Sequence, residues 1–146
     1  MLSLQAITNK DRSTLKNTTY ECITDDEWER LILDSTCRLH DNCYFELFKI
    51  IDGENVIGLI NLYAHSPHII SCGPEIKPQY QKQGYAYKAE LLALKAAKLL
   101  GYTIAVAYVK ESNFASIRLH EKLGFELDNK FVNAHKNEMR LYIKAL

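Results

Sequence analysis

The sequence predicts an α/β fold of the mixed α+β kind, in which a mostly antiparallel sheet carries helices on both faces. Short aromatic and β-branched runs, typical of strands, dominate residues 44–76. A long helical run at residues 84–100 separates them from a buried-type strand at residues 103–109. A strand, a helix and a second strand in that order form a parallel crossover, so the sheet is expected to contain one parallel pair.

The N-terminal third of the chain is predicted to contain one strand and two helices. Residues 2–7 are expected to form a short strand, and the polar, weakly periodic residues 9–23 are predicted as a helix. At Thr24 a Thr-Asp-Asp-Glu capping box places side-chain acceptors on free backbone N–H groups. This box predicts a second helix that ends near residue 36.

The central strands are marked by turn residues. Residues 44–51 and 56–63 are joined by Asp-Gly-Glu-Asn, which predicts a β-hairpin. A third strand covers residues 69–76 and contains Gly73 and Pro74. A glycine and a proline inside a strand indicate a β-bulge, or a place where a ligand approaches the backbone.

The second half of the chain contains the helix with the clearest signal. Residues 84–100 repeat apolar side chains at helical spacing, so Ala89, Leu92 and Leu99 are expected on the buried face. A glycine follows the helix and is expected to end it. The remaining elements are a strand over residues 103–109, a helix over 113–123 that also stops at a glycine, and strands over 125–131 and 138–145.

Length, charge and composition narrow the functional classes. The 146 residues are expected to form one domain, residues 1–146, in which 18 basic side chains balance 18 acidic ones. A neutral chain is not expected to bind nucleic acid or an anionic membrane, and no apolar run approaches the ~20 residues of a membrane span. No signal peptide is recognised, and the four cysteines are expected to stay reduced, so a cytoplasmic location is predicted.

Cysteine and histidine side chains gather in two segments. Cys37, His40 and Cys43 lie close together in one, and His65 and His68 lie in the other. Zinc usually takes four ligands in a tetrahedral arrangement, whereas so loose a pattern arises by chance. The expectation is therefore that the protein holds no metal.

The start of the long helix indicates an anion-binding site. Gln, Tyr, Gln, Lys and Gln separate Pro78 from Gly84, so no Ser, Thr, Asp or Asn occupies the cap position. The first N–H groups of the helix are therefore left without a side-chain acceptor. Gly84 and Ala86 allow a ligand to approach closely and Lys82 adds positive charge, which suits a phosphate or pyrophosphate. The alternative is an ordinary loop whose helix end is capped by water.

A second helix favours the ligand site over the ordinary loop. Asn113, Ser116 and His120 are spaced to form one polar stripe along it. Such a stripe beside an anion site is typical of a ligand-facing wall. The alternative is that Asn113 is only an N-cap and His120 a solvated surface histidine.

Two segments resemble motifs of the GNAT superfamily of acyl-CoA N-acyltransferases. IKPQYQKQGYA at residues 76–86 matches the Gln/Arg-x-x-Gly-x-Gly/Ala loop of the family, and ESNFASIRLHEKLGFE at residues 111–126 is similar to its second motif. The order of strands and helices is similar over nearly the whole chain, nearest to protein N-terminal and ribosomal-protein acetyltransferases. The resemblance implies acetyl-CoA as co-substrate and two parallel strands splayed apart at Gly73 and Pro74.

The resemblance also implies contacts with coenzyme A. In the family, backbone N–H groups of the loop hold the pyrophosphate, and the matching residues are Lys82, Gln83, Gly84, Tyr85, Ala86 and Tyr87. The strand before the loop pairs with the pantetheine arm like an added strand, which implies Pro74, Glu75 and Ile76. Asn113 matches an asparagine that contacts the cofactor.

Two departures from the family pattern affect the chemistry. The tyrosine that protonates the leaving thiolate is replaced by His120, whose imidazole can also donate a proton near neutral pH. The position of a glutamate base found in some members is occupied by Tyr108, so another group or a water chain must take the proton of the amine. Glu75, on the splayed strand, is the candidate base, and the alternative is a surface carboxylate at a strand end.

Three functional hypotheses remain. The preferred one is an N-acetyltransferase that acts on a primary amine, of a small molecule or a peptide N-terminus, by direct attack in a ternary complex. The second is a non-catalytic coenzyme A or nucleotide-binding sensor module, and the third a purely structural interaction domain. The enzyme is preferred because His120 is a chemically competent replacement. The sequence does not name the acceptor, and a homodimer through an exposed C-terminal strand is a further expectation.

Overall fold

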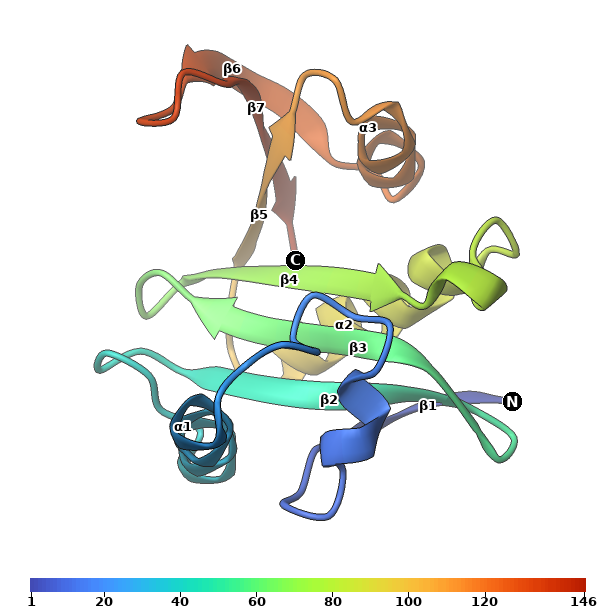
Figure 1. Cartoon of the computed structure of the whole chain (residues 1–146). Coiled ribbons are helices and arrows are strands. Elements are labelled where there is room, and N and C mark those ends of the chain that lie inside the picture. The colour runs from blue at the N-terminus through green and yellow to red at the C-terminus, as the bar shows by residue number, and fades with distance from the viewer.

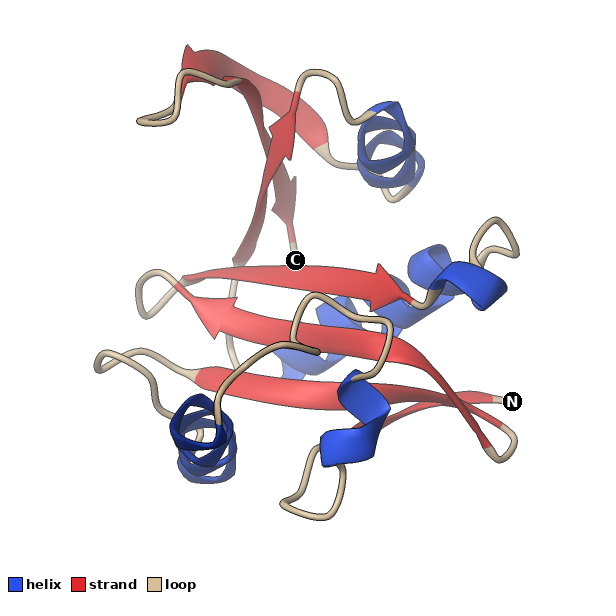
Figure 2. Ribbon diagram, in the orientation of Figure 1, coloured by secondary structure: helices blue, strands red, loops and turns tan.

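Seven strands form one sheet in the order β1-β2-β3-β4-β5-β7-β6, and each neighbouring pair is antiparallel except β4 and β5 (Figures 1 and 2). The computed structural model describes all 146 residues. The strands are β1 (Leu2–Ala6), β2 (Phe45–Asp52), β3 (Asn55–Ala64), β4 (Ile69–Ile76), β5 (Ile104–Lys110), β6 (Glu126–Val132) and β7 (Glu138–Ala145). The predicted mixed, mostly antiparallel sheet is confirmed.

Helices pack on both faces of this sheet. They are α1 (Asp25–Cys37), α2 (Tyr85–Leu99) and α3 (Phe114–Lys122). Leu59 and Ile60 are neighbours on β3 and therefore point to opposite faces. Leu59 packs with Trp28 of α1 in one apolar cluster, whereas Ile60 belongs to the larger cluster that contains the alanines of α2. Figure 1 shows the same arrangement, with α1 in front of the sheet and α2 behind it. None of the helices combines the length and apolar character needed to cross a bilayer.

The buried face of α2 differs from the predicted one. Ala89, Ala93 and Ala97 are fully buried, whereas Leu92 is exposed and Leu99 is 82% exposed. Apolar residues occur on nearly every side of this helix, so helical spacing alone did not fix its orientation. Three alanines at four-residue intervals allow the helix backbone to approach the sheet closely, and packing therefore favours that face.

The helix predicted over residues 9–23 is wrong. The segment contains a single 3-10 turn, η1 (Arg12–Leu15), followed by irregular turns. The hydroxyl of Thr14 donates to the carbonyl of Asp11, and the hydroxyl of Thr18 donates to the carbonyl of Leu15. Asp and Thr side chains that bond to nearby backbone groups compete with helical bonding, which explains the turns.

The predicted capped helix and hairpin are confirmed. Thr24 is the N-cap of α1, and its hydroxyl oxygen accepts the N–H of Glu27 at 3.1 Å. The Glu27 carboxylate bonds to the Thr24 hydroxyl rather than to its backbone, so only one half of the capping box forms. Asp52 pairs with Asn55 across the tight turn between β2 and β3.

The parallel strands β4 and β5 separate soon after they begin. They pair only at Ile69 with Ile104 and at Ile70 with Ala105. Beyond these residues β4 stays with β3, whereas β5 pairs with β7 along its whole length. In Figure 1, β5, β7 and β6 rise away from β4 as a separate arm of the sheet. The splayed pair that the resemblance implied is therefore present.

The β-bulge expected at Gly73 and Pro74 is absent from the pairing of β4 with β3. The register is unbroken from Gly58 opposite Ile76 to Ala64 opposite Ile70. The N–H of Lys77 bonds to β3, so alternation directs the nitrogen of Pro74 to the opposite, splayed side. Since that side has no strand partner, a proline there costs no ladder bond and no bulge is needed.

Candidate active site

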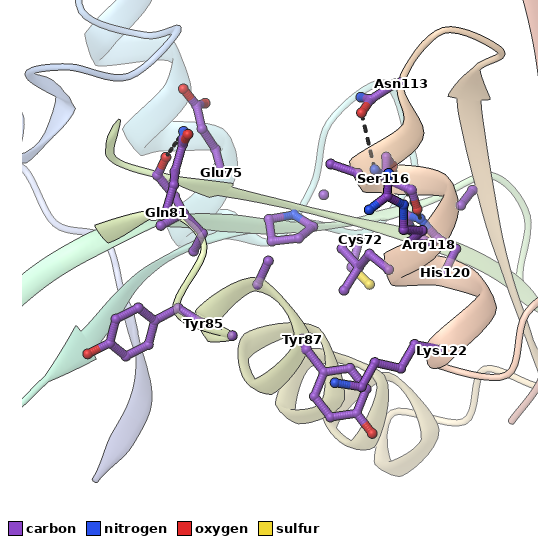
Figure 3. A pocket seen from close by; sticks show the side chains of 18 of the residues that line it. Cys72, Glu75, Gln81, Tyr85, Tyr87, Asn113, Ser116, Arg118, His120 and Lys122 are labelled. Carbon is purple, nitrogen blue, oxygen red and sulfur yellow. Dashed lines mark hydrogen bonds between the residues drawn. The ribbon is translucent and has the colours of Figure 1, made fainter. Parts of the chain in front are cut away.

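The splayed strands border a cleft of about 840 Å³. Its walls come from β4, the loop before α2, the first turn of α2, β5 and α3 (Figure 3). Nine of the ten residues expected to contact coenzyme A line it, namely Pro74, Glu75, Ile76, Lys82, Gly84, Tyr85, Ala86, Tyr87 and Asn113. Gln83 does not, and its side chain donates to the carbonyl of Gln79 at 3.4 Å. The two sequence motifs therefore meet at one cleft.

The loop before α2 leaves the start of this helix open. Gly84 is the N-cap, with a φ of +82°, and no side chain caps the helix. Lys82 also has a positive φ, +62°, and the Gln81 side chain donates to the carbonyl of Ile76 at 3.0 Å. The uncapped helix start that the sequence predicted is confirmed. Its free N–H groups and helix dipole belong to residues that line the cleft, which favours an anion there.

The cleft carries an excess of positive charge. Lys82, Arg118 and Lys122 line it, and Glu75 is its only carboxylate. The Nζ atom of Lys122 lies 4.4 Å from the centre of the Tyr87 ring, which connects α3 to the first turns of α2. Arg118 and Lys122 were not predicted from the sequence, because their place in the cleft depends on how α3 packs. The charge suits a ligand with several phosphates.

The predicted polar stripe of α3 forms only in part. Asn113 is the N-cap, and its Oδ1 atom accepts the N–H of Ser116 at 3.1 Å. His120 is neither solvated nor fully turned to the ligand side, because only 5% of it is exposed. Its ring packs edge-on against Phe125 and stacks on Tyr142, so it touches the cleft with a small part of its surface.

Both ring nitrogens of His120 have partners inside the protein. Nδ1 lies 2.8 Å from the carbonyl oxygen of Ser116, and Nε2 lies 3.0 Å from Oε1 of Glu90 on α2. The second contact lacks the angle of a hydrogen bond, so charge holds the pair. Burial lowers the pKa of His120, but Glu90 and the Ser116 carbonyl raise it more, and the pKa lies above its ordinary value. Glu90 was not predicted from the sequence, although a glutamate beside Ala89 in an apolar helix was an available signal.

Glu75 and Tyr108 face the cleft from the two splayed strands. The Glu75 carboxylate accepts the N–H of Thr19 at 2.6 Å and its hydroxyl at 2.8 Å. Tyr108 is 54% exposed, and its ring lies edge-on to His65 and Phe131. Their chemical roles stay predictions.

A second hollow of about 520 Å³ lies beside α1. It is lined by three carboxylates, Asp26, Glu27 and Asp34, by Arg30 and His40, and by Leu31, Tyr20, Phe45 and Tyr63. Tyr63 of β3 pairs with Ser71 of β4, and Ser71 lines the first cleft, so the two cavities are neighbours. A partly acidic, aromatic lining suits a positively charged group.

The fold is similar to those of solved acetyltransferases. A spermidine N-acetyltransferase from Vibrio cholerae, in complex with CoA and spermine, has a TM-score of 0.81 and 21% identity, over 99% of this chain and 95% of that one. A Salmonella typhimurium acetyltransferase that modifies the N-terminal serine of a ribosomal subunit protein has a TM-score of 0.82 and 14% identity, with the same coverage. An N-acetyltransferase from Staphylococcus aureus has a TM-score of 0.78 and 19% identity, over 99% of this chain and 98% of that one.

The family assignment comes from the sequence of the chain itself. No curated protein matches it significantly. The family model described as the acetyltransferase (GNAT) domain matches residues 3–126, which span both motifs and most of the sheet. The chain therefore belongs to the GNAT family and is an acetyl-CoA-dependent N-acyltransferase.

Proposed function

We propose that this enzyme transfers an acetyl group from acetyl-CoA to a primary amine, on a small molecule or at a peptide N-terminus, by direct attack in a ternary complex. The cleft between β4 and β5 carries the proposal, because the uncapped start of α2 opens onto it. It combines an anion site, three basic side chains and a strand edge without a partner. These features match the diphosphate and the amide-containing arm of coenzyme A.

The pyrophosphate is proposed to lie against the N–H groups of residues 82–87. Lys82, Arg118 and Lys122 supply positive charge to the phosphates. The pantetheine arm then lies along the outward edge of β4 past Ile70, where no strand pairs with it. Because Pro74 offers no N–H on that side, the arm can bond there only to the carbonyl of Pro74 and to the backbone groups of Cys72 and Ile76, which alternation also directs outward.

The chemistry requires one proton to leave the amine and one to reach the thiolate. The neutral amine attacks the thioester carbonyl, a C–N bond forms and the C–S bond breaks. His120 is proposed as the acid that protonates the sulfur, since it is the only histidine that lines the cleft. Glu75 is proposed as the base, because it is the only carboxylate there, with Tyr108 as the alternative on the facing strand.

The acceptor class is proposed from the neighbouring hollow. Asp34 is paired with Arg30 and His40, so Asp26 and Glu27 are the carboxylates that favour a cationic amine over an acidic peptide. Two of the similar structures are described as acting on spermidine and on an N-terminal serine, and both of these substrates carry a primary amine. Linear polyamines are therefore the first group to test, and peptides with basic residues near a free N-terminus are the second.

An acetylation screen tests the proposal. Purified protein is incubated with acetyl-CoA and with diamines, polyamines, amino sugars and short peptides, and products are detected by mass and by thiol release. The expected result is the addition of one acetyl group to at least one amine, and none to the matched peptide whose N-terminus is blocked. Tight binding of coenzyme A without turnover of any amine would contradict the proposal and favour a sensor module.

A further inference from the structure

Three titratable side chains from three elements meet in the wall of the cleft. Cys72 comes from β4, Glu90 from α2 and His120 from α3. They are 8%, 0% and 5% exposed, so all three are withdrawn from solvent. Cys72 and His120 also line the cleft, as Figure 3 shows, whereas Glu90 does not. The cluster therefore connects the floor of the cleft to both helices that border it.

The contacts define where the protons of this cluster are. Nδ1 of His120 faces a carbonyl oxygen, which only accepts, so Nδ1 carries a hydrogen. Nε2 of His120 and Sγ of Cys72 both face Oε1 of Glu90, at 3.0 Å and 3.7 Å. The other carboxylate oxygen, Oε2, has no partner in the protein.

An isolated carboxylate at this depth is strongly destabilised. The Cys72 thiol gives it a weak, neutral donor, because burial and then Glu90 raise the pKa of Cys72 well above its usual range. His120 is the only cation in contact with Glu90, at 3.0 Å. The imidazolium form of His120 therefore provides the positive charge that the carboxylate needs.

We propose that Glu90 is a positioning residue that keeps His120 protonated and fixes its ring at the wall of the cleft, so that the acid of the reaction is the His120–Glu90 pair. This inference rests on the proposed acetyl transfer. As the C–S bond breaks, the sulfur takes the hydroxyl proton of Ser116, which lines the cleft, and that hydroxyl takes the Nδ1 proton of His120 from 3.3 Å away. The amide nitrogen loses its own proton to the base or to water. The pair then regains a proton from solvent, so each turnover leaves the enzyme unchanged.

Glu90 is the only carboxylate in contact with His120. From β7, the Tyr142 ring stacks on the imidazole at 6.3 Å, and its hydroxyl contacts Arg140 and Glu121 rather than His120. The other neighbours of the ring are Phe125, the hydroxyl of Ser116 and the backbone of α3, and none of them carries a charge. When the charge of Glu90 is removed, burial therefore becomes the main influence on the pKa of the His120 imidazole. Burial favours the neutral form of the ring.

The Glu90→Gln variant tests the proposal, since glutamine keeps the shape of the side chain and removes its charge. In the free protein, the His120 imidazole, followed by NMR, should titrate at lower pH than in the wild type. In single-turnover assays at saturating acceptor, the alkaline limb of the rate profile should move to lower pH by the same amount. At pH 8 the rate should fall in proportion to this displacement, because each pH unit corresponds to a tenfold change in the protonated fraction. Affinity for coenzyme A should not change.

A matched control is Glu121→Gln, which removes a carboxylate from α3 that contacts Tyr142 and not His120. Neither the titration of His120 nor the pH dependence of the rate should change in this variant. An unchanged His120 titration in folded Glu90→Gln protein would overturn the proposal, and this readout needs no turnover. If the titration moves while no amine is acetylated, the proposed function fails and the link between Glu90 and His120 stands. If Glu90→Gln does not fold, titration of the Glu90 and His120 side chains in the wild-type protein tests the proposal instead. A His120 imidazole that is neutral at pH 6 would overturn it.

Discussion

The anion site at the start of α2 is tested most directly by Gly84→Asp. Gly84 is the N-cap residue of α2, at the point where the first N–H groups of the helix are free. A β-carbon added to Gly84 meets no atom within 4 Å, so an aspartate fits without a clash. Its carboxylate can then cap the helix itself and also places a negative charge where the pyrophosphate is proposed to bind.

The magnitude follows from two separate effects. A non-glycine residue at a φ of +82° costs roughly 1–2 kcal/mol of folding free energy. Two like charges about 5 Å apart repel by roughly 1–3 kcal/mol at effective dielectric constants between that of water and 20. Each 1.4 kcal/mol is tenfold in affinity, so the Kd for coenzyme A should rise by about tenfold to a hundredfold. Part of the loss should disappear at high ionic strength.

Calorimetric titration with coenzyme A gives this Kd, and Gly53→Asp supplies the control. Gly53 also has a positive φ, +62°, and open space around its β-carbon, but it lies in the turn between β2 and β3. Both variants should lose a similar amount of stability, and only Gly84→Asp should lose affinity. Unchanged affinity in folded Gly84→Asp protein would refute an anion site at this helix start.

Two further outcomes follow from buried groups. His120→Ala should lower kcat by about 10²–10⁴-fold, because this is the usual contribution of a general acid, and should change the Kd for coenzyme A little. A wild-type rate in an assay limited by the chemical step would exclude the role of His120 as the acid. Cys22 and Cys37 are exposed, whereas Cys72 is buried and burial raises its pKa. Alkylation of the native protein should therefore label Cys22 and Cys37 quickly and Cys72 last, and all four thiols should react after denaturation. Rapid labelling of Cys72, followed by mass spectrometry of its peptide, would contradict the burial of this thiol.

Local sequence signals predicted most elements, because the relevant interactions are local. Thr24 as a cap, the tight turn after Asp52 and the glycines that follow α2 and α3 each act within a few residues. The uncapped start of α2 could also be predicted, since it depends on which residue stands at one position. The predicted helix over residues 9–23 failed where threonine side chains bonded to the local backbone, a competition that helical periodicity does not measure.

Features that depend on packing could not be predicted from spacing. His120 was placed correctly on α3, but its burial depends on how α2 packs beside it. The orientation of α2 in turn depends on which of its several apolar faces packs against the sheet. An error of that kind in α2 also concealed Glu90, which became significant only when its helix faced His120. Arg118 and Lys122 were missed for the same reason. Motif positions identified the cleft, whereas its electrostatics required the tertiary structure.

The role of Glu75 can be separated from its structural contacts by two variants. Both carboxylate oxygens bond to Thr19, which ties β4 to the segment that leads into α1. Each oxygen has a second lone pair, so these bonds do not prevent Glu75 from accepting a proton from the amine. If Glu75 is the base, Glu75→Gln should lower kcat by about a hundredfold or more.

Thr19→Val keeps the carboxylate and removes only one of its donors, so it should raise the KM for the acceptor and leave kcat nearly unchanged. Steady-state kinetics of the two variants with one acceptor gives both constants. Equal increases in acceptor KM with kcat retained in both variants would show that Glu75 only holds the segment in place. The proton of the amine would then leave through Tyr108 or water, because no other carboxylate lines the cleft.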